Sequence, residues 1–128
     1  MKNLLMFLAL LASAAAPKLT PEEKARLQAS RATYLAAVAA KPEDASAWLN
    51  LGRVEQALGE AEAARDAYKE AVRRGPEDAG AWSLLALAHE KLEEFRLAAS
   101  AWEVCVAKSK DPALTAVARK HLKHLRSQ

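Results

Sequence analysis

Apolar residues recur along the chain at the three- and four-residue spacing of amphipathic helices. Trp48, Leu51, Val54 and Leu58 form one such stripe, and Ala64, Tyr68, Ala71 and Val72 form another. No run of Val, Ile and Thr alternates with a period of two residues, so the pattern does not support strands. The spacing predicts an all-α protein with helices over about 21–40, 45–58, 61–74, 79–92, 95–108 and 112–126.

The pattern repeats itself along the chain. KPEDASAW at 41–48 returns as GPEDAGAW at 75–82, an offset of 34 residues that also relates Leu51 to Leu85 and Tyr68 to Trp102. A fixed period of this length with helical content is typical of a helical repeat array. Asp44 and Asp78 are suited to cap the first helix of each copy, and Gly59 and Gly75 to end helices.

These signals divide the chain into segments. Two full repeat units are predicted over 45–78 and 79–111. A leading helix within 17–44 begins at Thr20-Pro21-Glu22-Glu23, a capping-box sequence, and matches the second helix of a unit. A helix within 112–128 with the apolar stripe Leu114, Val117, Ala118, Leu122 and Leu125 caps the array, because terminal repeats need a polar outer face.

The repeated positions resemble the tetratricopeptide repeat consensus over about residues 41–112. The residues that carry the resemblance are Trp48, Leu51, Gly52, Ala64, Tyr68, Ala71 and Pro76 in the first copy and Trp82, Leu85, Ala98, Trp102 and Cys105 in the second. Ala86 and Lys110 depart from the usual glycine and proline, and Glu55 and His89 stand where tyrosine is common. The resemblance implies a right-handed α-solenoid of antiparallel helix pairs.

The resemblance also implies a binding surface, because first helices in this family line a concave groove that holds a peptide or a partner segment. Asn50 matches an asparagine that bonds a peptide backbone, and Arg53 is placed to meet a carboxylate. Ordinary surface polarity is the alternative for these positions. The predicted groove residues are Ser46, Leu49, Asn50, Arg53, Gln56, Ser83, Leu87, Glu90 and Lys91.

Charge adds a second candidate surface. The formal net charge of +3 is too small to indicate a nucleic-acid partner. The last helix carries Arg119, Lys120, Lys123 and Arg126, with no acid after Asp111. Such a helix can bind an acidic protein or an anionic membrane surface. The alternative is a solvated cap whose late cations suit the helix dipole.

Catalytic chemistry has little support. Cys105 falls on a packing face where the first copy has Ala71, which indicates a buried structural thiol. The glycines are scattered at turns rather than gathered in a phosphate-binding loop, and the Glu93-Glu94 pair is expected in a solvated turn. His121 and His124 are three residues apart, but no third metal ligand is evident. We therefore predict neither an enzyme nor a cofactor or metal site, and expect a non-catalytic interaction module or adaptor.

The first 16 residues are typical of a secretory signal peptide. Lys2 precedes an apolar stretch, and the small residues around 14–16 suit cleavage. This predicts export to a periplasm or the outside of the cell; the alternative is an uncleaved membrane anchor. The single cysteine cannot form an internal disulfide, and two repeats make a thin core, so self-association into a homo-oligomer is a further hypothesis.

Overall fold

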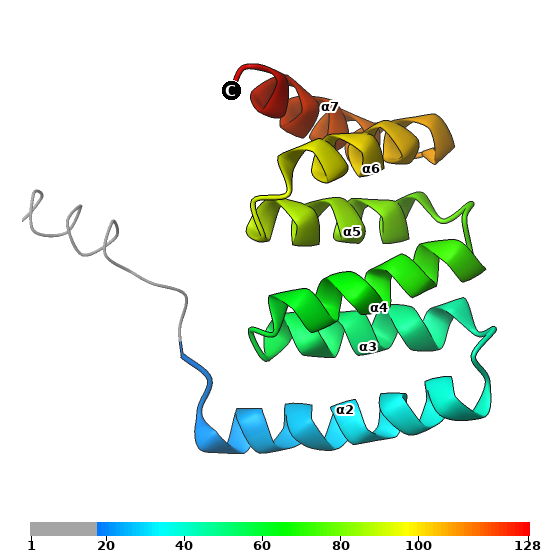
Figure 1. The fold of residues 1–128 in the computed structure, drawn as a ribbon, viewed down its shortest axis with the longest axis vertical. Helices are drawn as coiled ribbons and strands as arrows, with labels where there is room; N and C mark the ends of the chain where they lie inside the picture. The colour runs from blue at the N-terminus through cyan, green and yellow to red at the C-terminus, as the bar shows by residue number, and fades with distance from the viewer. Residues whose placement is uncertain (1–17) are drawn as a thin grey trace, which may run out of the picture.

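The computed structural model describes residues 18–128, and the predicted signal peptide lies outside this range. Over these residues the chain is helical and contains no strand, which confirms the all-α prediction. Figure 1 shows the helices stacked in chain order, each packed against the next, as an α-solenoid. The helices are α2 Pro21–Ala40, α3 Ala45–Ala57, α4 Ala61–Arg74, α5 Ala79–Lys91, α6 Phe95–Lys108 and α7 Pro112–Arg126. Among them, none is both long and apolar enough to cross a membrane.

The helix starts follow the predicted caps. Thr20 and Glu23 form a reciprocal capping box at α2, which satisfies backbone N–H groups that the first turn leaves unbonded. Asp44, Asp78 and Asp111 accept N–H bonds at the starts of α3, α5 and α7. The second helices α4 and α6 have Glu60 and Glu94 at the cap position and no side-chain cap bond, in keeping with the preference of helix caps for Ser, Thr, Asp and Asn.

The two turns inside the repeats share one backbone conformation. Gly59, between α3 and α4, has φ of 80°, the left-handed region that glycine enters without steric cost. Glu93 occupies the matching turn between α5 and α6 with φ of 59°. Both turns therefore contain a residue with positive φ, but only the first repeat has glycine at that position.

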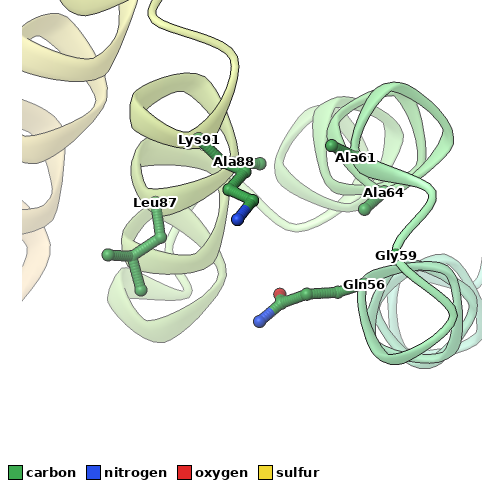
Figure 2. Close-up of a pocket in the computed structure, with 7 residues that line it drawn as sticks. All are labelled: Gln56, Gly59, Ala61, Ala64, Leu87, Ala88 and Lys91. Carbon is green, nitrogen blue, oxygen red and sulfur yellow. The ribbon is translucent and has the colours of Figure 1, made fainter. Parts of the chain in front are cut away.

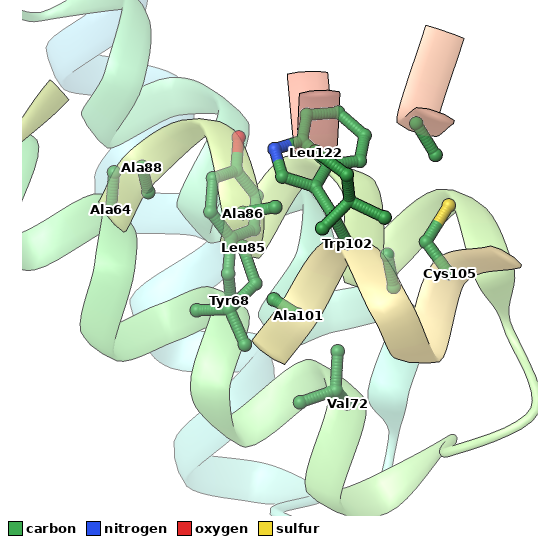
Figure 3. Close-up of a cluster of buried hydrophobic side chains, with 12 residues drawn as sticks. Ala64, Tyr68, Val72, Leu85, Ala86, Ala88, Ala101, Trp102, Cys105 and Leu122 are labelled. Carbon is green, nitrogen blue, oxygen red and sulfur yellow. The ribbon is translucent and has the colours of Figure 1, made fainter. Parts of the chain in front are cut away.

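The core lies between neighbouring helices, and the predicted signature residues form much of it. The larger cluster runs through α4, α5, α6 and α7, and Figure 3 shows Tyr68, Leu85 and Trp102 within it. The smaller one joins α2, α3 and α4 and contains Val38 and Leu51. The signature residues that are buried are Leu51, Gly52, Ala64, Tyr68, Ala71, Leu85, Ala98, Trp102 and Cys105. Burying these apolar groups stabilises the stack.

Two side-chain hydrogen bonds recur in both repeats. Trp48 and Trp82 are half-buried, and each donates its indole N–H to the carbonyl of the proline six residues earlier, at 2.7 and 2.8 Å. Deeper in the repeats, Tyr68 donates to Gln56 at 2.7 Å and Trp102 donates to Glu90 at 2.8 Å. Both bonds connect a packing aromatic residue to a group on another segment, and so fix how each unit closes.

The capping helix differs from its predicted stripe at one position. Leu114, Ala118, Leu122 and Leu125 pack against the larger cluster as expected. Val117 is instead 47% exposed, so its inclusion in the stripe was wrong. Ala118 is the fully buried contact of α7, and the residue before it on a helix is turned about 100° away from that contact.

Candidate protein-binding groove

A hollow of about 370 Å³ lies where the ends of α3 and α5 meet the start of α4. We call it the α3/α5 groove. Small residues line it on the α3–α4 side because Gly59 ends α3 and the alanines of α4 have short side chains. Figure 2 shows its lining residues: Gln56, Gly59, Ala61, Ala64, Leu87, Ala88 and Lys91. Leu87 is 39% exposed there, which leaves an apolar surface that a partner side chain can cover.

One polar group at this groove, Gln56, is held in place by a core residue. Gln56 accepts a hydrogen bond from the Tyr68 hydroxyl through Oε1, which leaves its amide nitrogen in the space between α3 and α5 (Figure 2). Burial raises the pKa of Tyr68 to about 12, against the opposing effect of the Arg53 charge. The raised pKa keeps Tyr68 a neutral donor to Gln56 at physiological pH.

The structure gathers only part of the predicted groove set in this hollow. Gln56, Leu87 and Lys91 line it together. Ser46 and Leu49 line a separate hollow of about 50 Å³ at the opposite end of α3. Asn50 is half-buried and Arg53 exposed on α3 between these two places. The arrangement provides an apolar floor with polar groups at its edge, and the roles of these side chains in binding stay predictions.

Two of the predicted groove residues form hydrogen bonds within the fold. Ser83 is buried, and its hydroxyl donates to the carbonyl of Gly80 at 2.6 Å. Glu90 is half-buried, and its Oε2 accepts from Trp102 at 2.8 Å and lies 2.9 Å from Nδ1 of His121. Both side chains therefore use hydrogen-bonding groups within the fold, and their role in binding a partner stays a prediction.

A buried polar network was missed by the sequence reasoning. Glu55 and His89, at the positions where the repeat usually has tyrosine, are both buried. Arg31 of α2 bonds Glu55 at 2.8 Å, whereas Arg65 reaches His89 through Glu94, at 3.1 and 3.2 Å. Glu94 lies at the expected turn and its side chain is 31% exposed. What the sequence did not predict is its bonds to His89 and Arg65, which lower the pKa of its carboxyl.

A sequence signal for this network was present. Arg31 and Arg65 are 34 residues apart, each one repeat period from the other. A buried charge is tolerated when it is paired, so an arginine repeated at this offset beside polar residues at tyrosine positions indicates a pair. The sequence does not reveal that one pair is direct and the other passes through Glu94.

The histidines of α7 and Cys105 were the residues considered for metal binding or thiol chemistry. His121 stacks on Trp102 with ring centroids 4.5 Å apart, while His124 is exposed. Cys105 is fully buried, and burial raises the pKa of its thiol, which disfavours the reactive thiolate. Within residues 18–128, no group of three or more His, Cys, Asp or Glu side chains is placed to hold a metal ion.

The basic face of α7 is partly gathered around a hollow. Arg119, Lys123 and Arg126 line a space of about 480 Å³ with Leu122 and Ser127. Lys120 is exposed on the same helix but does not line that space. Arg126 is bonded to Glu103 of α6 at 3.1 Å, so part of the charge is balanced within the molecule.

Comparison with solved structures agrees with this fold. The chaperone PcrH, bound to the chaperone binding region of PopD, is 21% identical, with a TM-score of 0.74 over 99% of this chain and 94% of that one. The Yersinia enterocolitica type III secretion translocator chaperone SycD is 15% identical, with a TM-score of 0.74 over 83% and 76%. A T3SS complex from Aeromonas hydrophila contains a chain 20% identical, with a TM-score of 0.75 over 80% and 71%.

Sequence comparison gives the family. No curated protein matches the chain in a sequence search. The tetratricopeptide repeat model, however, matches twice, over residues 23–79 and 49–112. These matches extend from the leading helix to the start of α7 and contain both copies of the repeated phrase. The chain belongs to the tetratricopeptide repeat family.

Proposed function

We propose that this protein is a non-catalytic interaction module that holds a segment of a partner protein in the α3/α5 groove. The observation that carries the proposal is the groove itself: an apolar hollow of about 370 Å³ with Leu87 at its surface and the polar ends of Gln56 and Lys91 beside it. Concave apolar sites with a few placed polar groups are the usual form of a binding pocket. A partner segment would bury an apolar side chain there.

The solved structures support a protein as the ligand. PcrH, a chain of the same fold, is described in complex with the chaperone binding region of PopD. A short helical array can therefore hold a segment of another protein without an enzymatic step. By analogy, we place this protein in the assembly or escort of another protein, with the predicted N-terminal export signal indicating an envelope or secreted complex.

The groove can be tested by crosslinking followed by measured affinity. A photoreactive residue replaces Leu87, and a matched one replaces Val117, which is also exposed but lies on α7. The Leu87 crosslinker should capture a partner from the envelope fraction. Once that partner is purified, Leu87→Asp should raise the Kd of its complex by about tenfold or more. Equal capture from both positions, with an unchanged Kd, would contradict the groove.

Asn50 and Arg53 test the carboxylate hypothesis separately. If they bond the backbone and a carboxylate of the bound segment, changing both to Ala should weaken binding by about tenfold, because charge-assisted bonds are the stronger ones. If the affinity is unchanged, Asn50 and Arg53 do not bond the bound segment, while the proposed apolar groove is not contradicted. Cys105→Ala should leave binding unchanged, since no thiol chemistry is proposed.

The basic face of α7 favours one alternative function. Because Arg119, Lys123 and Arg126 gather around one hollow, α7 could bind an acidic protein or an anionic membrane. Lys120→Glu with Lys123→Glu should then abolish sedimentation with phosphatidylserine vesicles or binding to an acidic partner. If binding is retained, α7 serves only as the solvated cap of the array. Export is tested independently by mass spectrometry of the N-terminus of the native protein, which should begin near residue 15.

A further inference from the structure

A second hollow, of about 450 Å³, lies across α4, α5 and α6. We call it the α4–α6 groove. Its apolar surface comes from Val72, Trp82, Leu85 and Leu97, and its charged surface comes from Lys69 and Arg73. Leu97 is 54% exposed, although moving a leucine side chain out of water is favourable and stabilises a protein. The groove therefore combines an uncovered apolar wall with two cations.

This groove is separate from the α3/α5 groove. The two hollows use different residues of α5, Leu85 here and Leu87 there. Residues two apart on a helix are turned by about 200°, so they lie on opposite faces of α5. Ligands in the two grooves would contact the protein from opposite sides, and both grooves could be occupied at once.

The two charged side chains that line the α4–α6 groove, Lys69 and Arg73, are both cations. His89 also lines it, 3.2 Å from Glu94. No acidic side chain lines the hollow, and Lys69 and Arg73 are one helical turn apart on the exposed side of α4. Glu70, the nearest acid on that helix, already bonds both Arg73 and Arg74, at 2.8 and 3.4 Å. Its single negative charge is shared between two arginines, so the end of α4 keeps a positive excess.

The first repeat shows that these features are not a requirement of the fold. One period earlier, Leu35, Ala39 and Ala63 stand at the positions of Lys69, Arg73 and Leu97. The same helix pairing thus forms with no cation at these positions and with alanine in place of the exposed leucine. The cations and Leu97 belong to the second groove alone.

We propose that the α4–α6 groove is a second docking surface, and that its occupant is an acidic, amphipathic segment of a partner protein. The segment would place a large apolar side chain against Leu97 and Trp82 and carboxylates beside Lys69 and Arg73. The positive groove steers and orients such a segment, because complementary charge across an interface favours the right partner. With both grooves occupied, the protein would bridge two partners.

The test uses peptides of defined charge as probes. Fluorescein-labelled dodecapeptides carry a central Leu or Phe flanked by Glu, with matched peptides that carry Gln or Lys instead. Binding is followed by fluorescence anisotropy and by amide shifts of the isotope-labelled protein. The Glu peptides should bind best, weaken with added salt, and shift the amides of Lys69, Arg73 and Leu97.

Variants then assign the site. Lys69→Glu with Arg73→Glu should weaken Glu-peptide binding by about tenfold and turn the preference toward the Lys peptides. Leu97→Ser should weaken the binding of every peptide. Lys24→Glu on α2, an exposed cation outside both grooves, is the matched charge-reversal control and should change none. All these side chains are exposed, and circular dichroism of each variant checks that it folds.

Three results would overturn the proposal. The first is the absence of amide shifts in this groove up to about 1 mM peptide. The second is Glu-peptide binding that is unchanged in Lys69→Glu with Arg73→Glu. The third is self-association of the protein alone, seen by sedimentation velocity and lost in Leu97→Ser. That result would make a second copy of the chain the occupant instead of an acidic partner.

Discussion

Replacing Gly52 with alanine tests how tightly the first repeat closes. A Cβ atom at Gly52 would lie 2.5 Å from both Cδ1 and Cε1 of the Tyr68 ring. Ordinary contacts begin at 3.4 Å, so the ring would have to retreat by about 1 Å within a packed core. Tyr68 is fully buried and bonded to Gln56, so its ring has little freedom to do so.

The expected loss of stability follows from opposing effects. Overpacking of a core costs about 1–3 kcal/mol, and strain on the Tyr68–Gln56 hydrogen bond adds up to about 1 kcal/mol. Alanine is about 1 kcal/mol better than glycine inside a helix. We therefore expect Gly52→Ala to lower the free energy of unfolding by about 2 kcal/mol, which is about 6–10 °C in Tm for a chain of this size.

Urea and thermal unfolding, followed by circular dichroism at the helix band and by tryptophan fluorescence, measure this change. Gly80→Ala is the matched control, because its Cβ would meet only one atom, Oδ1 of the Asp78 cap, at 3.2 Å. It should leave the stability equal or slightly higher. A smaller side chain in Tyr68→Leu should remove most of the Gly52→Ala penalty. The reasoning fails if Gly52→Ala is as stable as the parent, or if the penalty is unchanged beside Tyr68→Leu.

Three further predictions concern the turns and the buried network. Glu93→Gly should raise stability by about 0.5–1 kcal/mol in urea unfolding, because glycine adopts the left-handed φ of 59° without strain; an unchanged or lower midpoint would contradict this. Arg31→Ala should cost about 2 kcal/mol, because Glu55 would stay buried without its partner and its Oε2 already has none. Arg26→Ala on the same helix is the control, and equal losses would refute the pairing. Glu94 has a lowered pKa in the folded protein, so its stabilising effect is complete above the ordinary carboxyl pKa and disappears as the pH falls through the lowered value. Glu94→Gln should therefore reduce the acid dependence of Tm, and an identical pH profile would exclude that role.

The fold could be predicted from the sequence because the helix starts and ends depend on capping and turn residues that act over a few positions. Asp44 and Asp78 cap the helices that follow them, and Gly59 ends α3, as their positions indicated. Such signals act over a few residues, and the 34-residue offset shows them twice. Val117 was misplaced, and the burial of Ser83 and the bonds of Glu94 were not predicted. These features depend on how a neighbouring helix lies against each residue, which periodicity alone does not specify.

The sequence by itself determined that this chain is all-α, where its helices begin, and that its helical unit repeats at an offset of 34 residues. These properties follow from capping residues, apolar spacing and repetition, which are local. Only the tertiary structure decided that Gln56, Leu87 and Lys91 share one hollow, that Glu90 bonds Trp102, and that Lys69 and Leu97 line a second groove. Each of these joins residues on different helices, and the rotation and crossing of packed helices set which side chains meet.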